Sequence, residues 1–336
     1  MNSKKFWIVK IIFLKGKNKL FFIVGSGHCG TKWLATTLNS PEHQVKCVHE
    51  FRNEYSNINW MMGNERLREQ GLYGFKEYFE YFKDLNDIGW DAGDSNSFSM
   101  DFFMQEDSVK FLKSQMNINY IHVLIRNGIR TVNSKIQHSL SNNPTEFLTL
   151  NAQTSWFEES LYNLNKVCLL HDLNRNDFIS DEQIQKSRKN IKLLHHSILS
   201  GQKLPQDYLV NIVEDLSPFH KVNTLVRWGY GLYNSKNLNK LQEIWGDKLL
   251  VWRLEDLTEN TESLHKILSL HNISYTEDQI LKLQKKDVNK KIATKDIPTM
   301  LQSWSKRDME LFKILCEDTM KFHKYDMEVF NSMLEK

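Results

Sequence analysis

Three glycines, Gly25, Gly27 and Gly30, form the first motif whose residue types and spacing suggest a chemical function. They lie in the stretch GSGHCGT, which follows the apolar run FFIV and precedes a helix-like pattern with apolar residues on one face. Glycine lets the backbone come close to an anion, and the first N–H groups and the dipole of a new helix attract negative charge. The pattern therefore predicts a phosphate cradle between a strand and a helix.

This cradle matches two nucleotide-binding patterns incompletely. A nucleotide triphosphatase loop ends in Lys followed by Ser or Thr, whereas here Thr31 precedes Lys32, and no later strand with a metal-binding acidic end stands out. The glycines match the dinucleotide pattern G-x-G-x-x-G, but no acidic residue ends a second strand at the ribose-binding distance. A plain glycine turn is the structural alternative.

A second anion-binding pattern lies in the stretch YIHVLIRNGIRTVNS. The apolar run 121–125 predicts a buried strand ending at Arg126, and Ser134 follows eight residues later in a predicted helix. Arg offers a planar fork of donors and Ser a hydroxyl, so both can point at one phosphate. Taken alone, Arg126 fits a structural ion pair equally well.

Together, GSGHCGTKWL and LIRNGIRTVNS resemble the two cofactor-binding motifs of sulfotransferases that use 3′-phosphoadenosine 5′-phosphosulfate. The stretch KLLVWRLEDL at 248–257 is similar to the late strand of these enzymes, and Asn289 and 304–325 resemble their C-terminal part. The resemblance covers roughly 20–140 and 227–325.

The resemblance implies transfer of a sulfuryl group from this phosphosulfate to an acceptor hydroxyl or amine, with adenosine 3′,5′-bisphosphate as the second product and no metal. In the family the first loop holds the 5′-phosphosulfate, and the Arg and Ser of the second motif hold the 3′-phosphate. The implied cofactor-binding residues are Gly25, Ser26, Gly27, His28, Cys29, Gly30, Thr31, Lys32, Trp33, Arg126 and Ser134.

Two positions of the first loop depart from the family pattern. Many members carry Lys or Arg at the position of His28, where the cation helps to hold the bridging and leaving-group oxygens. A neutral His donates one hydrogen bond there, and a protonated one adds charge. Many members also have a second hydroxyl residue where this chain has Lys32, so Lys32 is a candidate for the missing cation.

The reaction also needs a base, because the acceptor hydroxyl loses its proton as it attacks. The second predicted strand, 44–49, ends in Val48-His49-Glu50, and parallel strands deliver their ends to one edge of a sheet. Since the family uses a His in some branches and a Glu in others, Glu50 is the first candidate and His49 the second. A buried His49 and a surface ion pair at Glu50 are the structural alternatives.

Two further segments are candidates for acceptor binding. The loop after Trp90 carries Asp94 and Asn96, which could hold acceptor hydroxyls or assist the base, with a solvated turn as the alternative. The region of about 141–226 is polar and helical in pattern, as at 182–200, and predicts a helical insertion on the acceptor side. A structural helical lobe is its alternative. A sugar, a lipid, a peptide tyrosine and a small alcohol all remain open as acceptors.

The expected fold is α/β, a single sulfotransferase-like domain over 1–336 with a mainly parallel central sheet flanked by helices and a P-loop-like architecture. We expect 21–24 and 121–125 as internal strands, because both are nearly continuous apolar runs. A last helix over 305–323 begins with a capping-box-like pattern.

The composition agrees with an ordinary enzyme. The chain has 336 residues, of which 40% are hydrophobic, enough for a sizeable core. Its net charge of +3 argues against nucleic-acid binding. The four cysteines are far apart, so no zinc site or disulfide framework is expected and a reducing compartment is favoured. The histidines without metal-ligand spacing, to which we assign no role, are His43, His122, His138, His195 and His196.

The basic, apolar segment 4–15 is too short, and too interrupted by Lys10, to predict a transmembrane span, and no signal-peptide cleavage site follows it. An element packed on the protein is favoured over an amphipathic stretch resting on a membrane surface. We therefore expect a cytoplasmic protein, with peripheral membrane contact through this segment as the alternative.

Two other function classes stay open. A P-loop nucleotide kinase or hydrolase would need magnesium, and the order of Thr31 and Lys32 argues against it. A non-catalytic relative that keeps the fold and binds a glycan would fit a loop altered at His28 and Lys32.

Overall fold

The chain divides into two compact units in the computed structural model. The first unit comprises Met1–Ile125 and Asn239–Asn289, and the second comprises Arg126–Leu238 and Lys290–Lys336. The structure describes residues 19–25, 28–49, 87–91, 103–104, 106–115, 117–141, 154–201, 205, 207–208, 211, 224–225, 228–229, 233–286 and 296–335.

The first unit is built around a five-stranded sheet in the order β2-β3-β1-β4-β5. The strands are β1 Lys19–Val24, β2 Val45–His49, β3 Asp87–Asp91, β4 Ile118–Ile125 and β5 Leu249–Arg253. Every neighbouring pair is parallel, and β1 and β4 are internal strands. The predicted α/β class, the parallel sheet and the two internal strands are therefore confirmed.

The apolar runs of β1 and β4 explain their central place. Phe22 and Ile23 of β1 and Leu124 and Ile125 of β4 have no exposed surface (0%), as expected for strands covered on both faces. The register aligns Ile23 with Asp91 of β3 on one side and with His122 of β4 on the other. The carboxyl ends of the central strands thus meet at one edge of the sheet.

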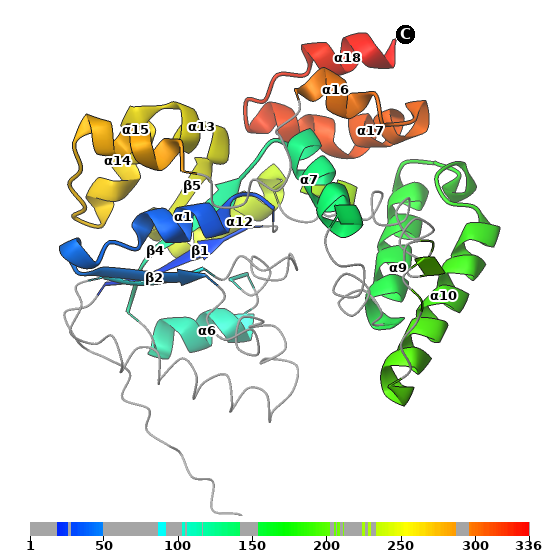
Figure 1. The fold of residues 1–336 in the computed structure, drawn as a ribbon, viewed down its shortest axis with the longest axis horizontal. Helices are drawn as coiled ribbons and strands as arrows, with labels where there is room; N and C mark the ends of the chain where they lie inside the picture. Colours follow the sequence, from blue (N-terminus) through cyan, green and yellow to red (C-terminus); the bar gives the residue numbers. More distant parts are fainter. Residues whose placement is uncertain are drawn as a thin grey trace, which may run out of the picture. The chain divides into compact units, whose positions relative to one another are not determined.

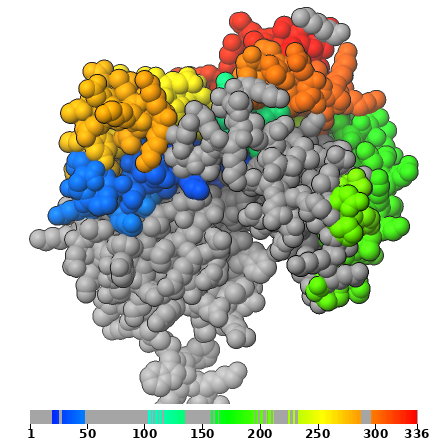
Figure 2. All heavy atoms as spheres, in the orientation of Figure 1, coloured from blue at the N-terminus to red at the C-terminus, as the bar shows by residue number. Residues whose placement is uncertain are grey.

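Helices cover this sheet, with α1 and α6 on opposite sides of it (Figure 1). The helices of this unit are α1 Thr31–Leu38, η1 Pro41–His43, α6 Glu106–Gln115, η4 Gly246–Lys248, α13 Leu254–Glu259, α14 Thr261–Leu270 and α15 Glu277–Gln284. Helix α12, Ser235–Trp245, runs across the boundary between the two units in the sequence. The segments that form α1 and β2 (blue) and α14 and α15 (gold) touch on the face shown in Figure 2.

The second unit is helical where the structure describes it. Its elements are α7 Gly128–Ser141, α9 Thr154–Leu170, η2 Arg175–Asp177, α10 Asp181–Ser200, α16 Ile297–Leu301, α17 Lys306–Phe322 and α18 Glu328–Leu334. The predicted capping box is present at the start of α17, where Ser305 Oγ accepts from the Asp308 N–H at 3.1 Å.

Helices α9 and α10 fall in the region predicted as a helical insertion, and they run side by side (Figure 1). Whether this region serves an acceptor, and whether one domain spans 1–336, stay predictions. None of the described helices is long and apolar enough to cross a bilayer. The segment 4–15 lies outside the described residues.

Candidate functional site

The glycine loop leaves the middle of the sheet at its carboxyl edge. It connects β1, which has neighbours on both sides, to α1. The next two strands in the sequence, β2 and β3, lie on one side of β1 in the sheet, and the last two, β4 and β5, lie on its other side. Ligands of open α/β sheets bind outside the carboxyl ends of the strands, at the point where the connections change direction. The loop therefore occupies the position in this sheet where a ligand is expected.

Gly25 must be a glycine because the space around it is closed. A Cβ at this position would meet Sγ of Cys29 and would lie 3.0 Å from the carbonyl oxygen of Leu124. The loop thus starts pressed against β4. A side chain at residue 25 would push the loop away from the sheet.

The far end of the loop turns through left-handed backbone conformations. His28 has φ 57° and Gly30 has φ 92°. A Cβ on Gly30 would lie 2.6 Å from the end of the Leu254 side chain, which would have to shift, so Gly30 is required above all for its backbone angle. A left-handed His is uncommon but is better tolerated than a branched residue.

The amino end of α1 is suited to an anion. The Leu34 N–H makes a helical bond to the Gly30 carbonyl at 3.0 Å, and Gly30, as the N-cap residue, brings no capping side chain. The first turn of α1 contains no acidic residue, but it contains the exposed Lys32. A cation in the first turn opposes the helix dipole, whereas an anion bound there would be stabilised by both.

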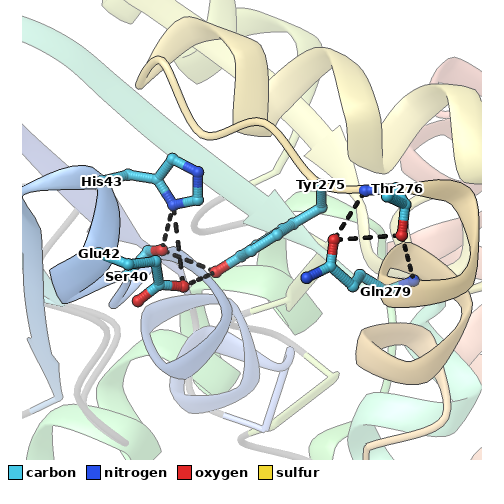
Figure 3. Close-up of polar contacts among 6 residues, drawn as sticks. All are labelled: Ser40, Glu42, His43, Tyr275, Thr276 and Gln279. Atoms are coloured by element: carbon cyan, nitrogen blue, oxygen red, sulfur yellow. Dashed lines mark hydrogen bonds and ion pairs between the residues drawn. The ribbon is translucent and has the colours of Figure 1, made fainter.

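At the amino ends of two other helices of the first unit, side chains cap the first N–H groups. Asn260 caps α14 by accepting from the Glu262 and Ser263 N–H groups, and Glu262 adds an acidic residue to the first turn. At α15, Thr276 and Gln279 form a capping box (Figure 3). The amino end of α1 differs from both because it supplies neither a capping side chain nor an acidic one.

The remaining residues predicted for this loop are unequally exposed. Cys29, Thr31 and Trp33 are buried, and His28 is half-buried. Among the described residues, the Trp33 indole Nε1 is a buried donor without a hydrogen-bond partner. A buried donor without a partner is costly, so this N–H is a place where a water molecule or a neighbouring group is expected. The predicted site residues outside the described part of the chain are Ser26, Gly27, Glu50, Asp94 and Asn96.

The candidate base His49 is the last residue of β2, two strands away from β1. The register aligns it with Asp91 of β3, which is in turn aligned with Ile23 of β1. Since neighbouring strands lie about 4.8 Å apart, the backbone of His49 is roughly 10 Å from β1. Asp91, which the sequence analysis did not single out, lies on the strand directly beside β1.

The second anion motif begins where β4 ends. Arg126 follows Ile125, the last residue of β4, and Ser134 lies within α7, as predicted. Both residues belong to the second unit and are half-buried. The amino end of α7, unlike that of α1, is capped by the side chain of the preceding residue: Asn127 Oδ1 accepts from the Ile129 N–H at 3.0 Å. Anion binding by this motif would therefore depend on the side chains of Arg126 and Ser134, because Asn127 already occupies amides at the start of α7.

Trp228 is a residue that the sequence analysis missed, and it holds the backbone of Arg126. Its indole Nε1 donates to the Arg126 carbonyl oxygen at 3.2 Å, although the two residues are 102 positions apart. The same indole lies against Gly128, where a Cβ would be 3.0 Å from the ring. The glycine in the sequence LIRNG was the available signal: it marks a close approach by a partner that the sequence does not name.

A second polar cluster lies between α1 and β2, at the edge of the sheet where β2 begins (Figure 3). Tyr275 donates to Glu42 Oε1 at 2.7 Å, and Ser40 Oγ lies 2.7 Å from the Tyr275 hydroxyl and 2.8 Å from His43 Nδ1. Since the Tyr275 proton goes to Glu42, Ser40 must donate to Tyr275, and His43 Nδ1–H must donate to Ser40.

That direction of donation excludes a hydrolytic triad in this cluster. A nucleophilic Ser must give its proton to the His, whereas here the His donates to the Ser. Ser40 is also only 1% exposed. The Tyr275 hydrogen bond is the largest cause that lowers the pKa of Glu42 to about 2. The cluster thus joins the start of β2 to the loop before α15.

No protein-family model and no curated protein matches this chain. Within the described residues, no group of three or more His, Cys, Asp or Glu side chains could hold a metal ion.

Proposed function

We propose that this protein is a sulfotransferase that moves a sulfuryl group from 3′-phosphoadenosine 5′-phosphosulfate to an acceptor hydroxyl or amine. The observation that carries the proposal is the glycine loop between β1 and α1. Gly25 leaves no room for a side chain, Gly30 has a left-handed backbone conformation, and no side chain caps the start of α1. This supports binding of an anion at the carboxyl edge of a parallel sheet.

The P-loop-like sulfotransferase architecture belongs to the same proposal. The motif with Arg126 and Ser134 follows β4, the strand that pairs with β1, so the two anion motifs follow neighbouring strands. We assign the 5′-phosphosulfate to the loop and the 3′-phosphate to the Arg126 guanidinium and the Ser134 hydroxyl. These groups suit a doubly anionic nucleotide, because guanidinium and hydroxyl donors match phosphate oxygens.

The proposed step is an in-line displacement. The acceptor oxygen forms a bond to sulfur while the bond from sulfur to the bridging phosphate oxygen breaks, and adenosine 3′,5′-bisphosphate leaves with the bonding electrons. Lys32 and His28 would stabilise the charge that develops on the leaving oxygens. A base takes the acceptor proton, with Glu50 as first candidate and His49 as second, and Asp94 and Asn96 would hold the acceptor.

A direct experiment is incubation with the phosphosulfate donor and a panel of sugar, lipid, peptide and small-alcohol acceptors, read by product mass. Sulfated product together with the bisphosphate is expected. Tight binding of adenosine 3′,5′-bisphosphate without any product would instead favour the non-catalytic, glycan-binding relative. Absence of bisphosphate binding would refute the proposal itself.

The second candidate function is a magnesium-dependent nucleotide kinase or hydrolase. The observation that favours it is Asp91, an acidic residue at the carboxyl end of β3, directly beside β1. An acidic residue that follows a strand and holds magnesium is part of the P-loop nucleotide hydrolases. The order of Thr31 and Lys32 remains the argument against this candidate.

Thermal unfolding separates the two candidates. The sulfotransferase proposal expects adenosine 3′,5′-bisphosphate to raise Tm without metal, since a ligand that binds only the folded state stabilises it. The second candidate expects ATP or GTP to raise Tm only with magnesium, and it expects Asp91→Asn to abolish that effect.

A further inference from the structure

Helix α10 in the second unit carries an open groove of about 400 Å³ that is lined mainly by cationic and polar side chains. The described residues that line it are Gln185, Arg188, Lys189, Lys192, Leu193 and His196. They recur at intervals of one, three and four residues, so they form one stripe along the helix. The glycine loop belongs to the first unit, and no predicted site residue lies on α10.

The charge along α10 is strongly asymmetric. Its acidic residues are confined to the first turn, at Asp181 and Glu182, and all its later charged residues are basic. Lys189, Lys192 and His196 are exposed, and no acidic residue is among the described residues that line the groove. A charged face of this kind attracts an anionic ligand, and the attraction weakens as salt rises.

Arg188 is held at the wall of the groove by a neighbouring helix. Its Nε donates to Glu158 Oε1 and its Nη2 to Glu158 Oε2, both at 2.8 Å. This bidentate pair fixes α9 against α10. Because Glu158 neutralises Arg188, the net positive charge available to a ligand comes from Lys189, Lys192 and, when it is protonated, His196.

We infer that this groove binds an acidic oligosaccharide, a chain of sugars that carries sulfate or carboxylate groups. The stripe from Arg188 to His196 covers about 12 Å of helix at 1.5 Å per residue, too long for one small anion to contact throughout. An extended ligand would contact the whole stripe at once. The Gln185 amide can bond sugar hydroxyls, and the half-buried Leu193 offers an apolar surface to a sugar ring.

Two other polyanions fit less well. Single-stranded nucleic acid is commonly bound by stacking on aromatic rings, and no Phe, Tyr or Trp is among the described residues that line the groove. An anionic membrane would require several exposed apolar side chains next to the cations, but on α10 Ile184, Ile191 and Leu194 are buried and Leu193 is half-buried. This inference goes beyond the proposed sulfuryl transfer and does not depend on it.

The test uses the full chain and a sulfated maltooctaose at about 0.15 M salt, where the Debye length is about 8 Å. Unsulfated maltooctaose, an oligonucleotide of equal charge and phosphatidylserine vesicles are the comparison ligands. The variant Lys189→Gln/Lys192→Gln should bind the sulfated sugar about tenfold more weakly, a loss in the range of two exposed charge contacts. The variant Lys189→Arg/Lys192→Arg should keep the affinity.

The matched control is Lys240→Gln/Lys266→Gln, which removes the same charge from two exposed lysines of α12 and α14. Its affinity should stay unchanged. Absence of binding by the unaltered chain, an equal loss in both Gln variants, or no loss in the groove variant would each overturn the inference. Tighter binding of the oligonucleotide or of the vesicles would also overturn it and assign the groove to that ligand. Sulfuryl transfer is measured separately, so either proposal can fail alone.

Discussion

The imidazole Nε2 of His122 lies 2.9 Å from the imidazole Nε2 of His271, inside the first unit. Trp252 Nε1 donates to His122 Nδ1 at 3.0 Å, so this nitrogen of His122 carries no proton. His122 must then donate its Nε2–H to His271 Nε2. The aromatic rings of Phe21 and Tyr120 pack against the pair, and both imidazoles are at most 1% exposed.

This pair makes the fold sensitive to acid. Burial is the largest cause that lowers the pKa of His122 well below its usual 6.5, and the charge of His271 adds to it. The unfolded chain therefore binds a proton that the folded chain excludes, and stability should fall as the pH drops below about 6.5. The limiting slope for one such proton is about 1.4 kcal/mol per pH unit.

The variant His122→Phe tests the origin of this slope. Phe fills a similar volume but cannot take a proton, so the free energy of unfolding should depend less on pH below about 6.5. The variant should also lose about 1–3 kcal/mol near neutral pH, because Trp252 and His271 lose a partner. Urea unfolding at several pH values measures both effects. The exposed His265→Gln is the control, and an unchanged slope in His122→Phe would contradict the prediction.

Local patterns were enough to predict the elements that carry the loop. The apolar runs of β1 and β4, the glycine turn and the capping box at Ser305 each depend on residues close in sequence. Strand β3 was not predicted, because DIGWD contains a glycine between two aspartates, residues that are depleted in strands. Its pairing with both β2 and β1 overrides that propensity.

Several contacts in the core and near the candidate site join residues far apart in the sequence, and they could not be predicted from it. His122 and His271 are 149 positions apart, and no metal-ligand spacing marks them. Trp228 reaches Arg126 from 102 positions away. Asp91 becomes a candidate site residue only because β3 lies beside β1 in the sheet. Such relationships follow from sheet order and packing, which one sequence does not specify.

Gly30→Ala should destabilise the chain and abolish binding of adenosine 3′,5′-bisphosphate. A left-handed angle costs a residue with a Cβ about 1–2 kcal/mol, and here the Cβ would also press on Leu254. Gly246→Ala is the matched control, since Gly246 also has a positive φ, 56°, but nothing lies within 4 Å of its Cβ position. Chemical unfolding should give the larger loss for Gly30→Ala. Equal losses would show that contact with Leu254 is unimportant.

Arg126→Ala should weaken binding of adenosine 3′,5′-bisphosphate by roughly 2–3 kcal/mol, the cost of losing a charge-assisted contact. Titration calorimetry without metal measures this change. Arg307→Ala is the control, because Arg307 is an exposed Arg of the same unit, paired with Asp177 at 3.2 Å. Unchanged affinity in Arg126→Ala would remove this residue from the proposed phosphate site.

Glu42→Gln should remove part of the stability that the cluster in Figure 3 provides. The pKa of Glu42 is lowered in the folded state from 4.5 to about 2, so its contribution is complete above about pH 4.5 and is lost as the pH falls toward 2. The loss should stay below about 1 kcal/mol, because the side chain is 58% exposed and water screens it.

A double-mutant cycle with Tyr275→Phe checks this assignment. The two substitutions should be non-additive near neutral pH, since both remove the same hydrogen bond, and the coupling should shrink near pH 3. Additive losses at both pH values would show that the contact contributes nothing to stability.

Glu50→Gln should lower turnover by roughly 10²–10⁴-fold, the usual range for loss of a general base, while the affinity for adenosine 3′,5′-bisphosphate hardly changes. His49→Asn and Asp91→Asn are the two comparisons, because the register places both residues at the carboxyl ends of strands near β1. If one of these causes the large loss while Glu50→Gln is nearly normal, the base is that residue. The base must also give turnover a pH dependence, because its protonation stops the reaction. The fall of turnover at low pH, the low-pH limb of the profile, should therefore disappear only in the variant from which the base has been removed. If all three variants keep both turnover and that limb, Glu50, His49 and Asp91 are each excluded as the base, and Asp94 becomes the next residue to change.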